Sequence, residues 1–323
     1  SMKILVTGGA GYIGAVTCHE LTKAGHQVTV LDCLEHGSKD RIKDLELVVG
    51  WTTDYDLVKQ VLVGREIEAV IHFAAWIEMG ESMARPHKYF HNNVYGSLQL
   101  LQAMVDSKVD KLVFSSTAGV YGNPLQIPIK EDDPKIPLNP YGQSKLMVEQ
   151  LLHFFSDIHK LRSVNIRYFN AAGARLDGSL GEAHQPESHL IPNIIQAVIH
   201  NQEFHLFGDD YDTPDGTCIR DYIHVLDLAQ THLIALEALA SGHPTDIYNA
   251  GIGTGYSNKE VIKMVEEIAG KKVNVKVEPK RPGDASQLIS DPQKFQTEFN
   301  WQPRYSDLRT IIQTAYSWHC LSA

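Results

Sequence analysis

Short apolar runs alternate with amphipathic stretches through the first half of the chain. Six runs rich in β-branched residues predict strands, at residues 3–7, 26–32, 45–49, 69–74, 111–116 and 163–169. The stretches between them predict helices near residues 12–24, 54–63, 82–106 and 141–159. Nearly continuous apolar strands separated by helices favour a doubly wound α/β fold, in which helices cover both faces of a parallel sheet.

The pattern changes after residue 170, where loops rich in Gly, Pro and His become longer. Helices are predicted there near residues 189–200, 226–241, 257–269 and 305–319. We therefore predict a Rossmann domain over residues 1–170, with segments near 220–250 returning to it. A smaller, loop-rich α/β domain is predicted over residues 171–323.

Composition and charge narrow the function classes. The 323 residues are 43% hydrophobic and 21% charged, which is typical of a globular protein with a buried core. The net charge of −10 provides no basic stripe for nucleic acid or an anionic membrane. No apolar run approaches the roughly 20 residues that cross a bilayer, and the start of the chain does not resemble a signal peptide. We expect neither a nucleic-acid nor a membrane partner.

Cysteine and histidine spacing gives two further expectations. The four cysteines are scattered without a CxxC pair, which is typical of reduced thiols and predicts a cytoplasmic protein. Sixteen histidines are present, but no HExxH motif and no clustered Cys/His spacing occurs. We therefore predict no metal site.

The segment VTGGAGYIG places Gly8, Gly11 and Gly14 three residues apart, between the first strand and the first helix. Glycines at this spacing let the backbone and the helix N-terminus approach a pyrophosphate. Asp32 ends the second strand, where its carboxylate can bind the adenine ribose hydroxyls and repel a 2′-phosphate. No arginine follows Asp32 directly, so the sequence predicts NAD as the cofactor, not NADP.

Two tyrosine–lysine pairs share one spacing. NPYGQSK sets Tyr141 four residues before Lys145, and DYDLVK sets Tyr55 four residues before Lys59. Only the first pair opens a helix after a proline-rich loop, following a strand that ends in SST, where the carboxyl ends of the strands face a cofactor. Tyr141 is therefore the candidate base, and the second pair is predicted to lie on a solvated helix face.

Together these motifs resemble the extended branch of the short-chain dehydrogenase/reductase superfamily and, within it, the UDP-glucose 4-epimerase (UDP-galactose 4-epimerase) family. The resemblance spans almost the whole chain. It rests on TGGAGYIG (7–14), SSTAGVYG (115–122), NPYGQSK (139–145), RYFNAAGA (167–174), GDDYDTPDGTCIRDYIHV (208–225) and RPGD (281–284). It implies an isomerase that inverts C4 of a UDP-hexose through a 4-keto intermediate, with transient hydride transfer to tightly bound NAD. It also implies a homodimer built through the helices at 82–106 and 141–159.

The resemblance assigns roles to individual residues. Tyr141 takes the proton of the sugar 4-hydroxyl, and Lys145 together with the positive nicotinamide ring lowers the pKa of that tyrosine. Lys145 also holds the nicotinamide ribose. Thr117, where many relatives carry serine, bridges substrate and base. Further cofactor contacts are implied at Tyr12, Ile13, Phe73, Ala74, Asn92 and Tyr168. Contacts with the UDP-sugar are implied at Asn170, Leu190, Phe207, Arg220, Arg281, Asp284 and Leu288.

Within the UDP-sugar set, the two arginines are expected on the pyrophosphate, because guanidinium groups bind phosphate oxygens in pairs. Asp284 is expected to hold a hydroxyl of the ligand or to orient Arg281. Leu288 corresponds to a position where a tyrosine in relatives excludes N-acetylated sugars, so the smaller leucine predicts room for an acetamido group.

Two departures and several alternatives accompany the resemblance. Trp51 replaces an aspartate that reads adenine in relatives, and Ile77 replaces a lysine beside the cofactor. A 4,6-dehydratase would carry Asp-Glu where this chain has Ala118 and Gly119, which counts against dehydration. UDP-N-acetylglucosamine and UDP-pentose epimerases remain open, as does a regulator that binds NAD without catalysis.

Overall fold

A computed structural model of the chain describes residues 1–322, which divide into two compact units. The first unit contains residues 1–123, 131–168 and 229–249. The second contains residues 124–130, 169–228 and the chain from Ala250 onward. Among the described residues no helix combines the length and the apolar character needed to span a bilayer.

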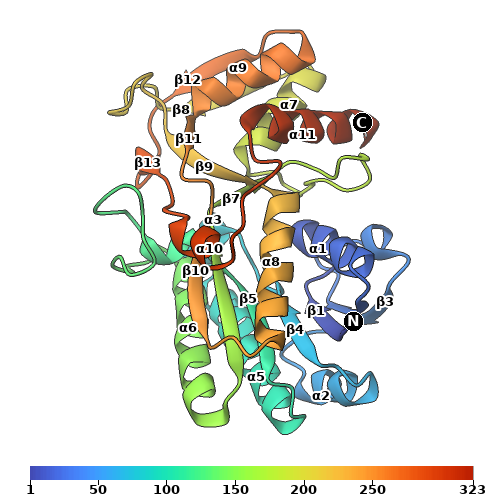
Figure 1. The fold of residues 1–323 in the computed structure, drawn as a ribbon. Coiled ribbons are helices and arrows are strands. Elements are labelled where there is room, and N and C mark those ends of the chain that lie inside the picture. Colours follow the sequence, from blue (N-terminus) through green and yellow to red (C-terminus); the bar gives the residue numbers. More distant parts are fainter. Residues whose placement is uncertain (323) are drawn as a thin grey trace. The chain divides into compact units, whose positions relative to one another are not determined.

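A seven-stranded sheet forms the centre of the first unit (Figure 1). Its strands are β1 (Lys3–Thr7), β2 (Gln27–Asp32), β3 (Glu46–Val49), β4 (Ala69–His72), β5 (Lys111–Thr117), β6 (Arg162–Tyr168) and β10 (Asp246–Ala250). Their order is β10-β6-β5-β4-β1-β2-β3, and the pairs from β1 to β6 are parallel. The strand order reverses at β1, which pairs with both β2 and β4, and ligands of such sheets bind at this switch point. The predicted doubly wound fold is confirmed.

Helices cover both faces of this sheet. They are α1 (Tyr12–Lys23), α2 (Tyr55–Gly64), α3 (Met79–Ala84), α4 (Pro86–Tyr89), α5 (Gly96–Asp106), α6 (Pro140–His159) and α8 (Val225–Ala240), with short helical turns η1 (Lys39–Ile42), η2 (Phe90–Tyr95) and η3 (Ala118–Tyr121). Leu100 of α5 and Leu152 of α6 share one buried cluster with Leu31 of β2. The neighbouring Val30 and Cys18 of α1 both lie against Gly9. Since successive strand residues point to opposite faces, α1 covers the other face.

The predicted helix over 82–106 is instead a series of shorter segments. Pro86 disfavours helical backbone at the preceding residue, and Arg85 accordingly has φ −134° and ψ 62°, which separates α3 from α4. The π-helical turn η2 then leads into α5. Asn93 in this turn is buried and exchanges hydrogen bonds of 2.9 and 3.0 Å with the backbone of Trp76. Its amide also donates to Ser144 Oγ on α6 (3.1 Å).

The second unit has small sheets and four helices. Its strands are β7 (Asn170–Ala172), β8 (Glu203–Phe207), β9 (Ile219–His224), β11 (Gly255–Ser257), β12 (Asn274–Glu278) and β13 (Gln287–Leu288). Its helices are α7 (Leu190–Ile199), α9 (Asn258–Ala269), α10 (Gln293–Glu298) and α11 (Leu308–Ser322). β9 pairs in parallel with β7 and β13 and antiparallel with β11, while β12 pairs with β8. The predicted helices are present, whereas the short strands were not predicted.

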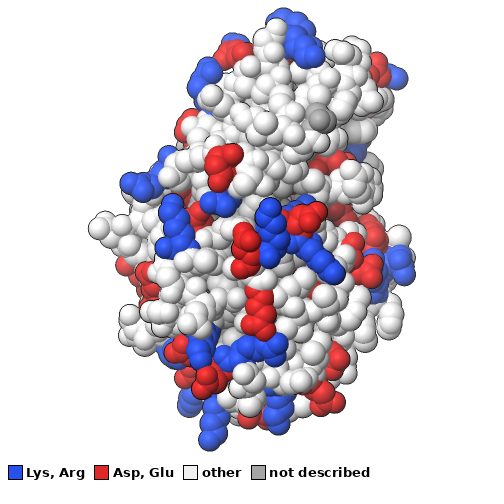
Figure 2. Space-filling model, turned by 90° about the vertical axis from the view of Figure 1, so that its right-hand side faces the viewer, with Lys and Arg blue, Asp and Glu red and all other residues white. Residues whose placement is uncertain are grey.

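Charged side chains of both signs are interspersed on the face that Figure 2 shows. On that face the described residues form no broad basic region, in keeping with the net charge of −10.

Candidate active site

The glycine loop joins β1 to α1 at the switch point of the sheet. A Cβ atom at Gly14 would lie only 2.3 Å from the carbonyl oxygen of Gly8, so no larger residue fits without moving the backbone. Gly11 caps α1 without a side-chain hydrogen bond, which leaves the first N–H groups of the helix available to an anion. The loop thus has the shape and polarity that a pyrophosphate requires.

Asp32 ends β2 beside this loop and is 7% exposed. Its carboxylate oxygens accept hydrogen bonds from the backbone N–H groups of Ala10 (3.0 Å) and Leu34 (2.8 Å). These bonds fix the carboxylate at the carboxyl end of the strand and leave further lone pairs for a ribose diol. The loop, the helix terminus and this carboxylate fit NAD.

The other predicted cofactor contacts cluster at the same edge of the sheet or in the segments that follow it. Tyr12 and Ile13 begin α1, and Asn92 lies in η2. Ala74 follows β4 and donates its N–H to Thr7 Oγ1 (3.3 Å). Phe73, also after β4, packs its ring 4.8 Å from that of His232, and Tyr168 ends β6.

Thr117, Tyr141 and Lys145 come together at the end of β5. All three are buried, and the hydroxyl groups of Thr117 and Tyr141 form a hydrogen bond. Lys145 Nζ donates to the Ser115 carbonyl oxygen (2.9 Å). A Cβ at Gly142 would lie 2.7 Å from the Gly119 oxygen, so glycine after the tyrosine lets α6 approach the turn that follows Thr117.

Burial dominates the protonation of this group. It raises the pKa of Tyr141, as does Tyr168, while the hydrogen bond with Thr117 lowers it. Burial also lowers the pKa of Lys145 to about 7, against the opposing effect of Glu149. The expectation that Lys145 and the nicotinamide ring together lower the pKa of Tyr141 stays a prediction, because these shifts belong to the protein without cofactor, where removal from water acts strongly on both groups.

A buried ion pair lies behind the strand that carries Thr117. Arg167 donates to both oxygens of Glu149, at 2.6 and 3.0 Å, and the two side chains are 1% and 3% exposed. Ser116 Oγ donates to Glu149 (2.5 Å), and Arg167 also donates to Tyr121 Oη (2.9 Å). This network was not predicted from the sequence, although charged residues inside otherwise apolar segments were a signal for it.

The second tyrosine–lysine pair has different surroundings. The Tyr55 hydroxyl donates to Asp106 on α5, and Lys59 is exposed with its Nζ 5.9 Å from the Tyr55 ring. Asp54 caps α2 by accepting the N–H of Leu57 (3.1 Å). Asp54, Tyr55 and Lys59 therefore stabilise the end and the surface of α2, and they do not form a buried proton-transfer group.

Trp51 belongs to an aromatic group near the carboxyl ends of the strands. Its ring lies 5.9 Å from that of Trp76, which in turn contacts the ring of His36 at 5.1 Å. Lys88 Nζ lies 4.0 Å from the centre of the Trp76 ring, a cation–π contact. Trp51 thus packs against the aromatic ring of Trp76.

In the second unit, Phe207, Arg281 and Asp284 form one group. The Arg281 guanidinium stacks 4.7 Å from the centre of the Phe207 ring, and its Nε donates to Asp284 Oδ2 (3.2 Å). Arg281 is 62% exposed at its side chain, so its remaining donors stay open to a ligand. Asp284 thus contacts Arg281, and whether it orients that arginine or holds a hydroxyl of the ligand stays a prediction.

The strand β9 organises the other predicted UDP contacts of the second unit. Arg220 pairs in register with Leu288 of β13, and Asn170 of β7 donates its amide to the Asp221 carbonyl (3.0 Å). Leu190 lies apart from this strand, at the start of α7, where it packs on a separate apolar cluster.

Asp221, next to Arg220, is fully buried and accepts four hydrogen bonds. The donors are the N–H groups of Ile252 (2.9 Å), Gly253 (3.1 Å) and Ser290 (3.0 Å) and the Ser290 hydroxyl (2.5 Å). One carboxylate therefore ties β9 to the segment after β10 and to the residues after β13.

Comparison with known proteins places these features in context. The sequence pattern of the NAD dependent epimerase/dehydratase family matches residues 4–251. The UDP-glucose 4-epimerase of Halalkalibacterium halodurans is 46% identical over 319 residues, which cover 98% of this chain and 96% of that protein. The structure of UDP-glucose 4-epimerase from Brucella ovis in complex with NAD has a TM-score of 0.95 at 40% identity and 98% coverage of both chains. That of the UDP-Glc/GlcNAc 4-epimerase from Campylobacter jejuni has a TM-score of 0.87 at 40% identity, covering 99% of this chain and 100% of that one.

Proposed function

The chain belongs to the NAD dependent epimerase/dehydratase family, and we propose that it is an NAD-dependent isomerase that interconverts UDP-glucose and UDP-galactose by inverting C4 of the sugar. The observation that carries this proposal is the buried group of Thr117, Tyr141 and Lys145 at the end of β5. This group provides a proton acceptor, a hydroxyl that can bridge to a substrate oxygen, and a cation to stabilise the phenolate.

Side chains of the protein transfer the proton, whereas hydride transfer requires the cofactor. The glycine loop and Asp32 would hold NAD, which would supply reversible hydride acceptance for C4 of the sugar. Tyr141 takes the proton of the 4-hydroxyl and returns it at the end of the reaction. Because burial raises the pKa of Tyr141, a neighbouring positive charge is needed to favour its phenolate, and protonated Lys145 supplies one. The reaction therefore requires Lys145 to be protonated and Tyr141 to be a phenolate before Tyr141 accepts the proton of the 4-hydroxyl.

We assign the nucleotide part of the substrate to the second unit. Arg220 and Arg281 bind the pyrophosphate, and the contact of Arg281 with Asp284 and the Phe207 ring limits its rotamers before the ligand arrives. Leu288 is half-buried beside Arg220 and contacts the sugar in this assignment.

The other candidate functions are less well supported. A 4,6-dehydratase needs a carboxylic acid after Thr117, whereas η3 begins there with Ala118 and Gly119. A regulator without activity has no use for a buried proton-transfer group such as Tyr141 and Lys145. Epimerases for UDP-pentoses or UDP-N-acetylglucosamine share the same catalytic group, and only substrate comparison separates them.

One experiment tests both the reaction and the cofactor. Purified protein is incubated with UDP-galactose without added cofactor, and the nucleotide sugars are separated by chromatography. We expect UDP-glucose to appear until equilibrium and NAD to be released when the protein is denatured, since the cofactor need not leave between turnovers. No conversion even with added NAD would refute the proposed activity. Release of NADP would contradict the role given to Asp32.

We further propose a cytoplasmic homodimer. The four cysteines are free in the described structure, which fits a reducing compartment. Large apolar side chains are exposed on the two helical regions expected at the dimer interface, including Leu98 (38%), Phe154 (60%) and Ile158 (68%). Light scattering should give a dimer mass for the parent protein and a monomer mass for the variant Phe154→Glu/Ile158→Glu. A monomer mass for the parent would refute the dimer.

A further inference from the structure

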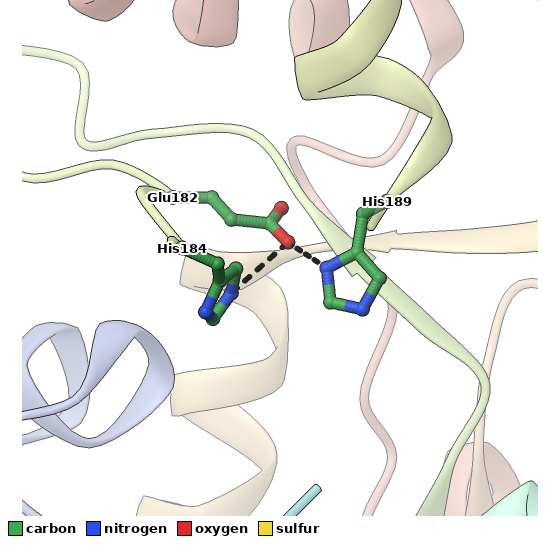
Figure 3. A group of neighbouring side chains, drawn as sticks. All are labelled: Glu182, His184 and His189. Atoms are coloured by element: carbon green, nitrogen blue, oxygen red, sulfur yellow. Dashed lines mark hydrogen bonds and ion pairs between the residues drawn. The ribbon is translucent and has the colours of Figure 1, made fainter. Parts of the chain in front are cut away.

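One glutamate and two histidines cluster in the second unit, and none of them has a role in the proposed reaction. Glu182, His184 and His189 stand on the loop between β7 and α7, and Figure 3 shows both imidazoles beside the carboxylate. His184 Nε2 lies 3.3 Å from Glu182 Oε1, and His189 Nδ1 contacts the same oxygen. One ligand atom from each residue lies within 4.8 Å of the others.

The cluster is closed on one side and open on the other. The Glu182 side chain is 5% exposed, and that of His184 is 18% exposed. The His189 side chain, by contrast, is 51% exposed. A small ligand therefore has a path to the buried carboxylate, and a position next to His189 remains within reach of water.

The loop that carries the cluster is held by Glu187, whose side chain is 5% exposed. Its carboxylate accepts the backbone N–H groups of His184 (3.3 Å), Ser188 (3.0 Å) and His189 (3.0 Å). These bonds fix the backbone of both histidines, so the three donors converge without depending on a ligand to assemble them.

We propose that Glu182, His184 and His189 bind one zinc ion. Two imidazole nitrogens and one carboxylate oxygen suit Zn²⁺, whereas Mg²⁺ and Ca²⁺ prefer oxygen ligands only. Zinc bonds of about 2.0–2.2 Å in tetrahedral geometry separate the ligand atoms by roughly 3.3–3.5 Å. Glu182 and His184 already lie at that separation (3.3 Å), whereas His189 Nδ1 contacts the same oxygen more closely and must move away from it to admit the ion. The three residues leave the fourth position to water.

Local charge also favours a cation. The start of α7, directly after His189, contributes roughly half a positive charge, which opposes a metal ion. Glu182 and Glu187 contribute two carboxylates to the same loop and outweigh that effect. The cluster matches neither HExxH nor a clustered Cys/His motif, because its spacing is Glu-x-His followed by four residues and a second histidine.

The same unit contains a matched control. His205 lies between two carboxylates, with Nδ1 2.9 Å from Glu278 and Nε2 3.3 Å from Glu203. The two ring nitrogens point away from each other, so these carboxylates cannot converge on one ion bound to His205. The residue has the same kind of partners without the converging geometry.

The test is zinc titration of the whole protein, without an affinity tag, against a coloured chelator. We expect one Zn²⁺ per chain, with binding that weakens as the histidines are protonated in acid. His189→Ala and Glu182→Gln should each weaken binding at least about 10- to 100-fold, the loss seen even for changes outside the ligand shell. His205→Ala should bind like the parent.

A second measurement keeps the test decisive if a variant folds poorly. Co²⁺ bound to the parent protein should give the strong visible absorption of a tetrahedral site, and Zn²⁺ should displace it. Absence of stoichiometric zinc binding to the parent would refute the proposal, as would unchanged binding in the folded Glu182→Gln variant. Zinc binding that responds equally to His205→Ala would mean adventitious histidine binding and would also refute it.

Discussion

The buried pair of Glu149 and Arg167 offers a stability prediction whose size follows from the structure. Replacing Glu149 by Gln keeps the side-chain shape but leaves the guanidinium of Arg167 without its charge partner at 1% exposure. Breaking a buried ion pair on one side costs about 3–5 kcal/mol, because the remaining charge stays out of water. We expect the loss of unfolding free energy for Glu149→Gln to lie near the lower end of this range, because the side-chain oxygen of the glutamine still accepts one of the two hydrogen bonds from Arg167.

Replacing both partners should cost less than the two single changes together. The variant Glu149→Met/Arg167→Met contains no unpaired charge, but the hydroxyl groups of Ser116 and Tyr121 lose partners, each worth about 1 kcal/mol. We therefore expect a total loss of about 1–3 kcal/mol and strong coupling between the two positions in a double-mutant cycle.

The assay is urea unfolding followed by circular dichroism, with the midpoint as the measured quantity. With a slope of about 3 kcal/mol per molar, the single variant should unfold at a urea concentration lower by about 1–1.7 M. Glu66→Gln is the control, because Glu66 forms an ion pair of the same 2.6 Å length with Lys3 on the surface, and its midpoint should not change. An unchanged midpoint for Glu149→Gln, or strict additivity in the cycle, would refute the reasoning.

Three further predictions concern the active site. Tyr141→Phe should reduce turnover at least about 10²- to 10⁴-fold with UDP affinity unchanged by calorimetry, while Tyr55→Phe stays near the parent; a loss smaller than tenfold would exclude Tyr141 as the base. Leu288→Tyr should reduce activity on UDP-N-acetylglucosamine about 10- to 200-fold more than activity on UDP-glucose, and equal losses would show that Leu288 only supports packing. Because burial lowers the pKa of Lys145 to about 7, the cofactor-free protein becomes more stable as pH rises from about 7 toward the ordinary lysine value. The Tm of Lys145→Met should therefore exceed that of the parent most near pH 6 and least near pH 10. A difference that does not change with pH would contradict the lowered pKa of Lys145.

The sequence predicted the first unit well because its signals are local. Apolar runs of four to seven residues mark the strands, and the glycine loop and Asp54 have turn and cap chemistry that needs no knowledge of distant contacts. The break in the predicted helix at Arg85 follows from Pro86 alone and was available from sequence. The π-turn at Asn93 was not, since it depends on hydrogen bonds with Trp76 and Ser144.

The second unit was predicted less completely because its strands are short and take their stability from tertiary pairing. A two-residue strand such as β13 has no periodicity to detect, yet it sets Leu288 beside Arg220. The protonation states of Tyr141 and Lys145 could not be predicted from the sequence either. Spacing placed Tyr141 next to Lys145, but only the depth of burial showed that both groups are driven toward their neutral forms.

The four hydrogen bonds of Asp221 also determine how the second unit can move. The N–H groups of Ile252, Gly253 and Ser290 share one buried acceptor, so none of them can open to solvent without leaving part of that carboxylate unsatisfied. In hydrogen exchange these three amides should behave as one cooperative unit, slower than their loop positions suggest. Arg220 directly precedes Asp221, and Leu288 lies two residues before Ser290. The backbone at both positions is therefore held by the hydrogen bonds of the Asp221 carboxylate. In the proposed function, a UDP-sugar too large for these positions would clash with side chains held in place, so the side-chain volumes would select the ligand by size.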